Sequence, residues 1–365
     1  MHGLLSELFI NLDLYSALQV VILGFIGGVL SGFIGSGGAF FMTPGMMNLG
    51  VQGVVAVASN ITHKFGKAMV GSHKHGEMGN VDKKLALSLL ITAAAGIRLA
   101  VWLSSLLFES GDASGGHKGA GANLYISLVF VSILTVVAVS MLKDVFGKKS
   151  DGDTGPSHKI AEALARLNLK PLIYFKVADV HVSLWVLLLV GLTTGYLAGT
   201  IGVGGFIGVP AMIYVFGIPT AVAAGTELYL AMFMGAFGAL NYAFAGYVDL
   251  RLVLLLFLGS LLGVHLGVYG VKVVKEKIIR LVTGVIILLC VLSRAVAIPV
   301  YLRQMDLINT AASWDGWLNS ASKGLLFASG FAGIGIIMYN VLKAYRQRLR
   351  LKRTIAYSQK PTGQH

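Results

Sequence analysis

Long apolar runs separated by short polar segments dominate the chain. Most runs are close to the roughly 20 residues that cross a hydrocarbon core as a helix. They lack the short alternating segments of a membrane β-barrel. The pattern therefore predicts an all-α fold with helices at 14–34, 53–75, 84–107, 124–143, 182–201, 219–244, 251–271, 278–299 and 324–343. Two shorter apolar pieces, 39–50 and 206–217, are too brief for an upright span, and the pattern leaves open whether they cross or re-enter.

The first half of the chain is repeated in the second. Residues 24–38 read GFIGGVLSGFIGSGG and residues 191–205 read GLTTGYLAGTIGVGG, with glycines at shared places. Residues 24–100 then align with 191–267 without a gap, so we interpret the match as an internal repeat. Each stretch ends in a glycine cluster, where a helix is expected to break because glycine is costly inside helices.

Composition places this repeat in a membrane. The chain is 56% hydrophobic and only 12% charged, with a mean hydropathy of +0.78, which is typical of an integral membrane protein. The net charge of +13 raises the question of nucleic acid, but the basic residues flank apolar spans, where they set orientation instead. Cys290 is the single cysteine of the sequence and excludes a disulfide framework or a thiolate metal site.

The basic loops predict which ends of the helices are cytoplasmic. Lys and Arg concentrate in the linker and in the C-terminal tail, whereas the loops 109–122 and 300–322 carry few. Connecting these loops needs an odd number of crossings per repeat, so the repeats are predicted to be inverted. The N-terminus is then outside and the C-terminus cytoplasmic. The predicted parts are repeat 1 (14–143), a basic linker (144–181), repeat 2 (182–299), an outer loop (300–323), an extra transmembrane helix (324–343) and a basic tail (344–365).

Inverted halves with Gly-interrupted, broken helices are typical of secondary transporters. In such proteins half-helix N-termini meet near the bilayer midplane, and their free backbone N–H groups attract anions. The alternative is that the glycines only allow close helix packing. The predicted backbone ligands are the first glycine cluster (Gly35, Ser36, Gly37 and Gly38) and the second glycine cluster (Gly202, Val203, Gly204 and Gly205).

Polar and ionisable residues within the spans indicate the sign of the ligand. Asn60, His63, Lys64 and Lys67 share one helical face, and Arg98 lies in the next apolar run. Intramembrane cations usually face a cavity or a partner. These candidate cations all come from the first half, so an anion is the expected substrate. Lys67, alternatively, extends toward the cytoplasm.

The repeat also pairs residues of different chemistry. Glu227 pairs with Asn60 and is the carboxylate well inside a predicted span. It either carries a coupling proton or neutralises Lys64 or Arg98. The paired hydroxyls of Ser59 and Thr226 are candidate ligands or helix-packing groups. The sequence suggests no metal site, no cofactor and no nucleophile with a base at useful spacing, which disfavours a membrane-embedded enzyme.

The repeated motifs resemble a known family. Each GxxxGxxxGxIGxGG stretch is followed by a Val-Ala-x-x-Ser/Thr segment and then by Gly-x-Val-Asp. Over about 20–143 and 182–299 this pattern resembles the TauE/SafE sulfite exporters, also called TSUP transporters. The resemblance assigns the family's signature glycines to Gly35, Gly37, Gly38, Gly202, Gly204 and Gly205, and its small hydroxyl positions to Ser59 and Thr226.

The resemblance implies a secondary transporter in the cytoplasmic membrane. Its expected substrates are small sulfur anions such as sulfite, sulfonates or thiosulfate, moved outward and coupled to a proton or sodium gradient. Its expected partners are this small anion, the lipid bilayer and the coupling ion, with no nucleic acid. Uptake of another small anion is the alternative, and the oligomeric state is left open.

Overall fold

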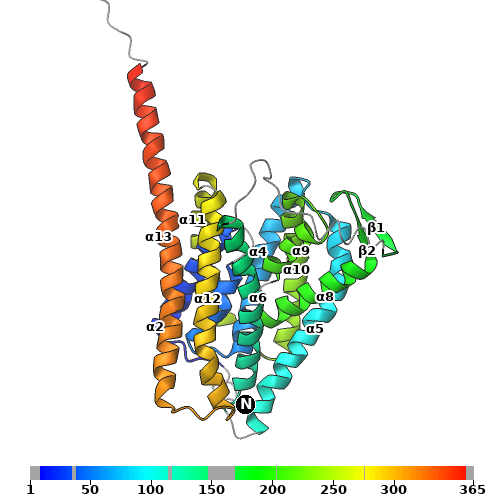
Figure 1. The fold of residues 1–365 in the computed structure, drawn as a ribbon, viewed down its shortest axis with the longest axis vertical. Helices are drawn as coiled ribbons and strands as arrows, with labels where there is room; N and C mark the ends of the chain where they lie inside the picture. The colour runs from blue at the N-terminus through cyan, green and yellow to red at the C-terminus, as the bar shows by residue number, and fades with distance from the viewer. Residues whose placement is uncertain are drawn as a thin grey trace, which may run out of the picture.

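The computed structural model describes residues 9–34, 38–113, 117–146, 169–202, 204–274 and 276–358. These residues form a bundle of long helices with one small hairpin at its side (Figure 1). The helices of the first half are α2 (Leu14–Ile34), α3 (Ala39–Asn48), α4 (Gly53–Glu77), α5 (Lys83–Ala113) and α6 (Ala120–Phe146). Those that follow are α8 (Leu184–Ile201), α9 (Gly205–Tyr214), α10 (Thr220–Phe244), α11 (Leu250–Val273), α12 (Glu276–Gln304) and α13 (Ser313–Ser358).

The predicted membrane-helix class is confirmed. Within the described residues, 8 helices are long and apolar enough to cross a membrane: α2, α5, α6, α8, α10, α11, α12 and α13. Helix α4 is also long, with 25 residues, but its cationic face lowers its hydropathy. Helices α3 and α9 have 10 residues each. At 1.5 Å per residue each covers about half of a hydrocarbon core, so neither crosses it alone.

The structure differs from the sequence prediction around the second half. An antiparallel hairpin, β1 (Leu172–Phe175) and β2 (Val180–Ser183), occupies the end of the predicted linker. Helix α12 continues to Gln304 and α13 begins at Ser313, so the predicted outer loop 300–323 is largely helical. Helix α13 also runs past the predicted end at 343 into the basic tail. Hydropathy marks only the apolar part of a helix, and Lys and Arg are good helix formers beyond it.

Close backbone contact joins α2 to α11. A Cβ atom added at Gly24 would lie 2.7 Å from the backbone oxygen of Leu256, and one added at Gly28 would lie 2.7 Å from the Cα atom of Ser260. Real Cβ atoms do not approach that closely, so this interface depends on glycine. Small residues four apart allow such an approach along a whole helix.

The same interface is built a second time between α5 and α8. A Cβ atom at Gly191 would lie 2.7 Å from the backbone oxygen of Leu89, and one at Gly195 would lie 2.5 Å from the Cα atom of Ala93. In the repeat alignment Gly191 corresponds to Gly24 and Leu89 to Leu256. Each packed pair therefore contains one helix from each half, joined through equivalent contacts.

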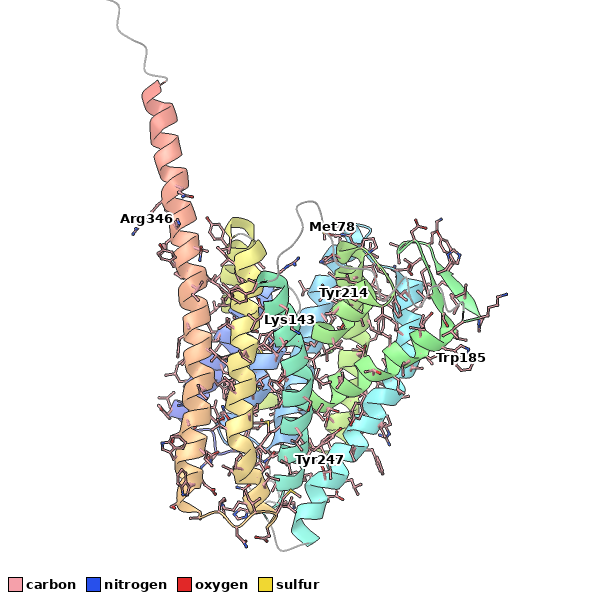
Figure 2. All side chains as sticks on the ribbon, in the orientation of Figure 1. Met78, Lys143, Trp185, Tyr214, Tyr247 and Arg346 are labelled. Atoms are coloured by element: carbon pink, nitrogen blue, oxygen red, sulfur yellow. The ribbon has the colours of Figure 1, made fainter. Side chains whose placement is uncertain are left out.

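The equivalent helices α4 and α10 run in opposite directions. Figure 2 places Met78, which follows α4, at the upper end of the bundle and Tyr247, which follows α10, near the lower end. Both helices are followed by an equivalent glycine in the left-handed region, Gly79 (φ 72°) and Gly246 (φ 78°). These φ values favour glycine and allow the chain to turn sharply after each helix.

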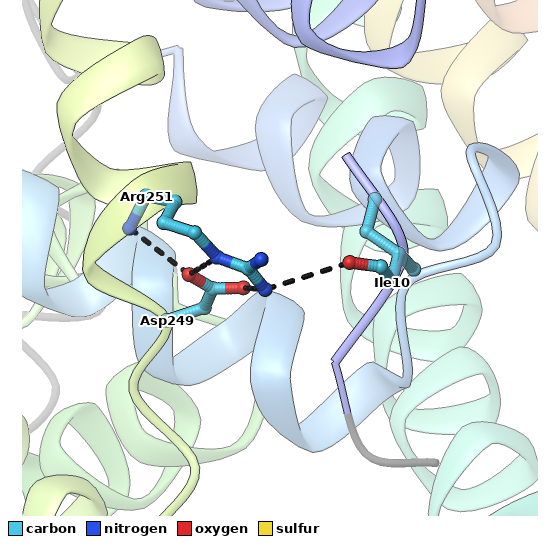
Figure 3. Close-up of polar contacts among 3 residues, drawn as sticks. All are labelled: Ile10, Asp249 and Arg251. Carbon is cyan, nitrogen blue, oxygen red and sulfur yellow. Dashed lines mark hydrogen bonds and ion pairs between the residues drawn. The ribbon is translucent and has the colours of Figure 1, made fainter. Parts of the chain in front are cut away.

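An equivalent aspartate begins the next helix in each half. Asp249 accepts a hydrogen bond from the backbone N–H of Arg251 (2.9 Å) and pairs with its guanidinium, which also reaches the carbonyl of Ile10 (3.5 Å) (Figure 3). Asp82 caps α5 through Leu85 N–H (3.0 Å) and accepts a second bond from Val177 N–H (3.0 Å). Each aspartate thus ties a helix start to the segment that leads into α2 or α8.

The packing makes a direct prediction for Gly28→Ala. The new methyl group would collide with the backbone of Ser260, and overpacking of this kind costs about 1–3 kcal/mol. The unfolding temperature of the purified protein in detergent should fall. Gly335→Ala is the matched control, because a Cβ atom there meets nothing within 4 Å. Equal unfolding temperatures for the two variants would contradict the proposed role of the glycine contact.

Candidate functional site

A cavity of about 250 Å³ lies between helices of both halves. Helices α2, α3 and α4 supply most of its wall, and α10 and α11 close it from the other half. Its lining residues are Ser31, Gly32, Gly38, Ala39, Met42, Asn60, His63, Lys64, Lys67, Ala68, Gly71, Leu228, Val264 and Val268. A volume of this size holds a small molecule or several waters.

Helix α4 gives the cavity its polar wall. Asn60, His63, Lys64 and Lys67 are three, four and seven residues apart, which places them on one face of the helix. The structure brings all four to the cavity. They come from one continuous helix, so their relative positions are fixed by the helix itself.

Neutral hydroxyl groups hold two of these side chains. The Nε2 atom of His63 lies 2.7 Å from Ser260 Oγ of α11, and Lys67 Nζ donates to Ser31 Oγ of α2 (2.7 Å). Within the described part of the chain, no acidic side chain forms an ion pair with Lys67. An ammonium group has three donors, so Lys67 retains donors for a ligand.

Asn60 connects the start of α3 with the end of α8. Its Nδ2 atom donates to the carbonyl of Ala39 (3.0 Å) and to Thr43 Oγ1 (2.8 Å). Thr43 in turn donates to the carbonyl of Ile201, the last residue of α8 (3.0 Å). Gly202 follows in the left-handed region (φ 75°), and a Cβ atom there would lie 2.9 Å from Asn60 Nδ2. The start of α3 and the end of α8 therefore meet at Asn60.

Glu227 and Lys64 lie together at the first turn of α9. A Cβ atom at Gly205 would lie 3.1 Å from Glu227 Oε1 and 3.5 Å from Lys64 Nζ, and a Cβ atom at Gly204 would lie 3.2 Å from the same ammonium. Glu227 is 2% exposed, and neither carboxylate oxygen has a hydrogen-bond partner among the described residues. The geometry thus places this buried carboxylate beside Lys64, and glycine at 205 leaves room for both groups.

Other predicted ligands lie away from the cavity. Arg98 is exposed on the surface of the bundle and donates to Asn241 Oδ1 (2.9 Å). Thr226 Oγ1 accepts from the backbone N–H of Asp82 (3.0 Å) and helps to hold the start of α5. Ser59 is buried, and its hydroxyl has no partner in the described structure. Gly35, Ser36, Gly37 and Val203 lie outside the described residues.

Sequence reasoning missed several buried polar groups. Ser31, Thr43 and Ser260 complete the contacts of the α4 face, but single hydroxyls in apolar runs carry no distinctive pattern. The sequence does show Arg294 as a cation inside the apolar run 278–299, although it was not among the predicted site residues. In the structure it is 1% exposed in α12. The expectation that the intramembrane cations come from the first half alone is therefore wrong.

Comparison with known proteins identifies the family. The model of the family described as "Sulfite exporter TauE/SafE" matches residues 20–294. The chain belongs to the TauE/SafE family. The matched range includes every helix from α3 to α11 and all the cavity-lining residues, whereas α13 lies beyond it. No solved structure matches this TauE/SafE chain.

Three relatives from Bacillus subtilis (strain 168) are each named as a probable membrane transporter protein. The chain is 27% identical to YjnA over 253 residues, 69% of this chain and 89% of that relative. It is 22% identical to YunE (74% and 94% covered) and 22% identical to YdhB (72% and 93% covered). Together with the spanning helices, these findings identify a multi-pass membrane transporter that acts on a small substrate in a lipid environment.

The proximity of Lys64 and Glu227 predicts energetic coupling between them. Lys64→Met and Glu227→Gln should each lower the unfolding temperature, because each leaves a buried polar partner behind. The double variant should lose less than the sum, with an interaction energy of about 1–3 kcal/mol. Thermal unfolding in detergent of the wild type, the two single variants and the double variant gives this interaction energy. Strictly additive losses would show that the two groups do not interact.

Proposed function

We propose that this TauE/SafE protein exports small sulfur-containing anions, such as sulfite, sulfonates or thiosulfate, across the cytoplasmic membrane by alternating access. The observation that carries the proposal is the cavity between the two halves, with Lys64, Lys67 and His63 in its wall. A cation inside a membrane is costly unless it has a partner or a function. Among the described residues, Glu227 supplies the one carboxylate beside Lys64, which leaves the site able to attract an anion.

The size and chemistry of the cavity support a small oxyanion as substrate. Its volume of about 250 Å³ suits a compact anion. Lys67 keeps donors beyond its bond to Ser31, and charge-assisted hydrogen bonds to an oxyanion are stronger than neutral ones. The amides of the two glycine clusters, at the starts of α3 and α9, are further proposed ligands.

Glu227 is the candidate for coupling to an ion gradient. Its carboxylate is buried beside Lys64, so the charge of one group affects the other. Binding of a proton or a sodium ion at Glu227 would leave Lys64 without its neighbour's negative charge. Lys64 would then attract the substrate anion more strongly, so the ion and the anion would move together, and this coupling supports export where the ion gradient is directed outward.

Alternating access follows from an inverted pair of repeats with interrupted first helices. Two observations support this architecture: α4 and α10 run in opposite directions, and the α2–α11 and α5–α8 interfaces use equivalent glycine contacts. The contact of Arg251 with the Ile10 carbonyl and that of Asp82 with Val177 N–H hold each pair at one end. We propose that these pairs move as rigid units around the cavity, as the halves of inverted-repeat transporters do.

The charge distribution supports the proposed orientation. Figure 2 places Lys143 and Arg346 toward the upper end of the bundle, where the basic linker and tail begin. Cytoplasmic loops are enriched in Lys and Arg, so the upper end is proposed to be cytoplasmic. The end near Tyr247 would then face outward.

Flux through reconstituted protein tests the site. Lys67→Gln should lower sulfite or thiosulfate flux at least tenfold, because a lost charge-assisted hydrogen bond of about 1.5–3 kcal/mol corresponds to tenfold or more in affinity. Arg98→Gln is the control, since that guanidinium bonds to Asn241 instead of lining the cavity. Flux would be measured in oriented proteoliposomes, with the anion loaded on either side.

Two results would change the proposal. Equal flux in Lys67→Gln and the wild type would remove the anion from this cavity, and a loss in Arg98→Gln would restore Arg98 to the site. Net movement only toward the cytoplasmic side would replace export by uptake, the alternative that uses the same cavity.

A further inference from the structure

A second and larger pocket, of about 510 Å³, opens at the end of the bundle where α12 ends. It lies where α3 ends, α4 and α6 begin, and α12 gives way to α13. Its polar lining includes Gln52, Asn123, Tyr301, His117 and Lys118, and no Asp or Glu is among the described residues that line it. It shares no lining residue with the cavity of the proposed transport site.

A buried guanidinium lies behind this pocket. Arg294 is 1% exposed and donates to Asn48 Oδ1, to Ser322 Oγ (3.3 Å) and to Tyr301 Oη (3.2 Å). Within the described chain it forms no ion pair with an acidic side chain, and its Nε atom has no partner. A buried charge held only by neutral groups leaves a positive potential in its surroundings.

The bond from Arg294 fixes the direction of the Tyr301 hydroxyl. An arginine side chain can only donate, so Tyr301 Oη must act as the acceptor of that bond. The phenolic hydrogen is therefore left for another acceptor. Because Tyr301 lines the pocket, this polarised O–H group is available to a ligand there.

A second series of hydrogen bonds also leaves a free donor at the pocket, the NH₂ group of Gln52. The backbone N–H of Gly53 donates to Asn123 Oδ1 (2.7 Å), so the other amide atom of Asn123, Nδ2, donates to Gln52 Oε1 (3.3 Å). The backbone donor thus orients both side-chain amides. It leaves the NH₂ group of Gln52 without a bond in the described structure, beside the pocket.

We propose that this pocket is a second binding site for a small oxyanion, held by the Gln52 NH₂ group and the Tyr301 hydroxyl in the field of Arg294. Lys118 adds positive charge at its rim, where its ammonium lies 5.8 Å from the centre of the Phe108 ring. Two separate hydrogen-bond chains present donors, and no described lining group presents a carboxylate. An anion accepts hydrogen bonds from both of these donors.

The second half of the chain lacks the matching groups. In the repeat alignment Gln52 corresponds to Pro219, whose side chain cannot replace an amide. The repeated fold therefore forms without this hydrogen-bond chain. The donors are specific to one end of the molecule, which supports a ligand-binding role.

Equilibrium binding of radiolabelled sulfate to the purified full-length protein tests the site. Gln52→Glu has the same shape and keeps the bond from Asn123, but it replaces the donor at the pocket with a negative charge. Sulfate bound at this pocket forms one class of binding sites, and its affinity should fall at least tenfold in Gln52→Glu. Tyr301→Phe, which removes a single hydroxyl, should weaken the same class several-fold, and Lys67→Gln should leave that class unchanged.

The outcomes separate this site from the proposed transport site. Loss of one binding class in Gln52→Glu and Tyr301→Phe, with wild-type unfolding temperatures, supports the inference even if Lys67→Gln has no effect on flux. Sulfate binding that matches the wild type in both folded variants would overturn it. No sulfate binding by the wild type, or complete loss in Lys67→Gln alone, would overturn it as well.

Discussion

The absence of side chains at a few glycines is the constraint on which the structure depends. Along α2 and α8 these glycines allow the backbone of α11 or α5 to approach to distances that a Cβ atom would forbid. Helices in lipid gain little from the hydrophobic effect, so such close packing is a main source of their association. Helices α4 and α10 pack against each other, and they join the two interfaces because α4 also contacts α11 and α10 also contacts α5.

This symmetric frame carries asymmetric chemistry. At the positions equivalent to Asn60, Lys64 and Lys67 of α4, helix α10 has Glu227, Ala231 and Met234. Among the described residues, Lys64 lies beside the carboxylate of Glu227, and Lys67 bonds to the hydroxyl of Ser31. Tight packing around them limits relaxation, so their charge remains available to a small ligand. The scaffold explains how two similar halves can surround one cavity with different chemistry on each side.

Much of the fold was predictable, because its determinants are periodic. The glycine spacing predicted the close interfaces, and the spacing of Asn60, His63, Lys64 and Lys67 predicted their common face. Arg98 shows the limit: its position in an apolar run is visible, but the direction in which its side chain points depends on how α5 packs with α8 and α10, and α5 contributes no residue to the cavity wall. Hydropathy likewise could not define the ends of α13 or the hairpin before α8. Those elements depend on helix propensity in water and on contacts such as the one between Asp82 and Val177.

The central claim is that a small anion occupies the cavity beside Lys64 and Lys67. Ala68 lines that cavity, and replacing Cys290 with alanine leaves a single introduced thiol in Ala68→Cys. The most direct measurement is the rate of maleimide labelling of this thiol in membrane vesicles, with sodium isethionate or an equal concentration of sodium chloride. The account predicts several-fold slower labelling with the sulfonate. Equal rates, over the concentrations that support flux, would contradict it.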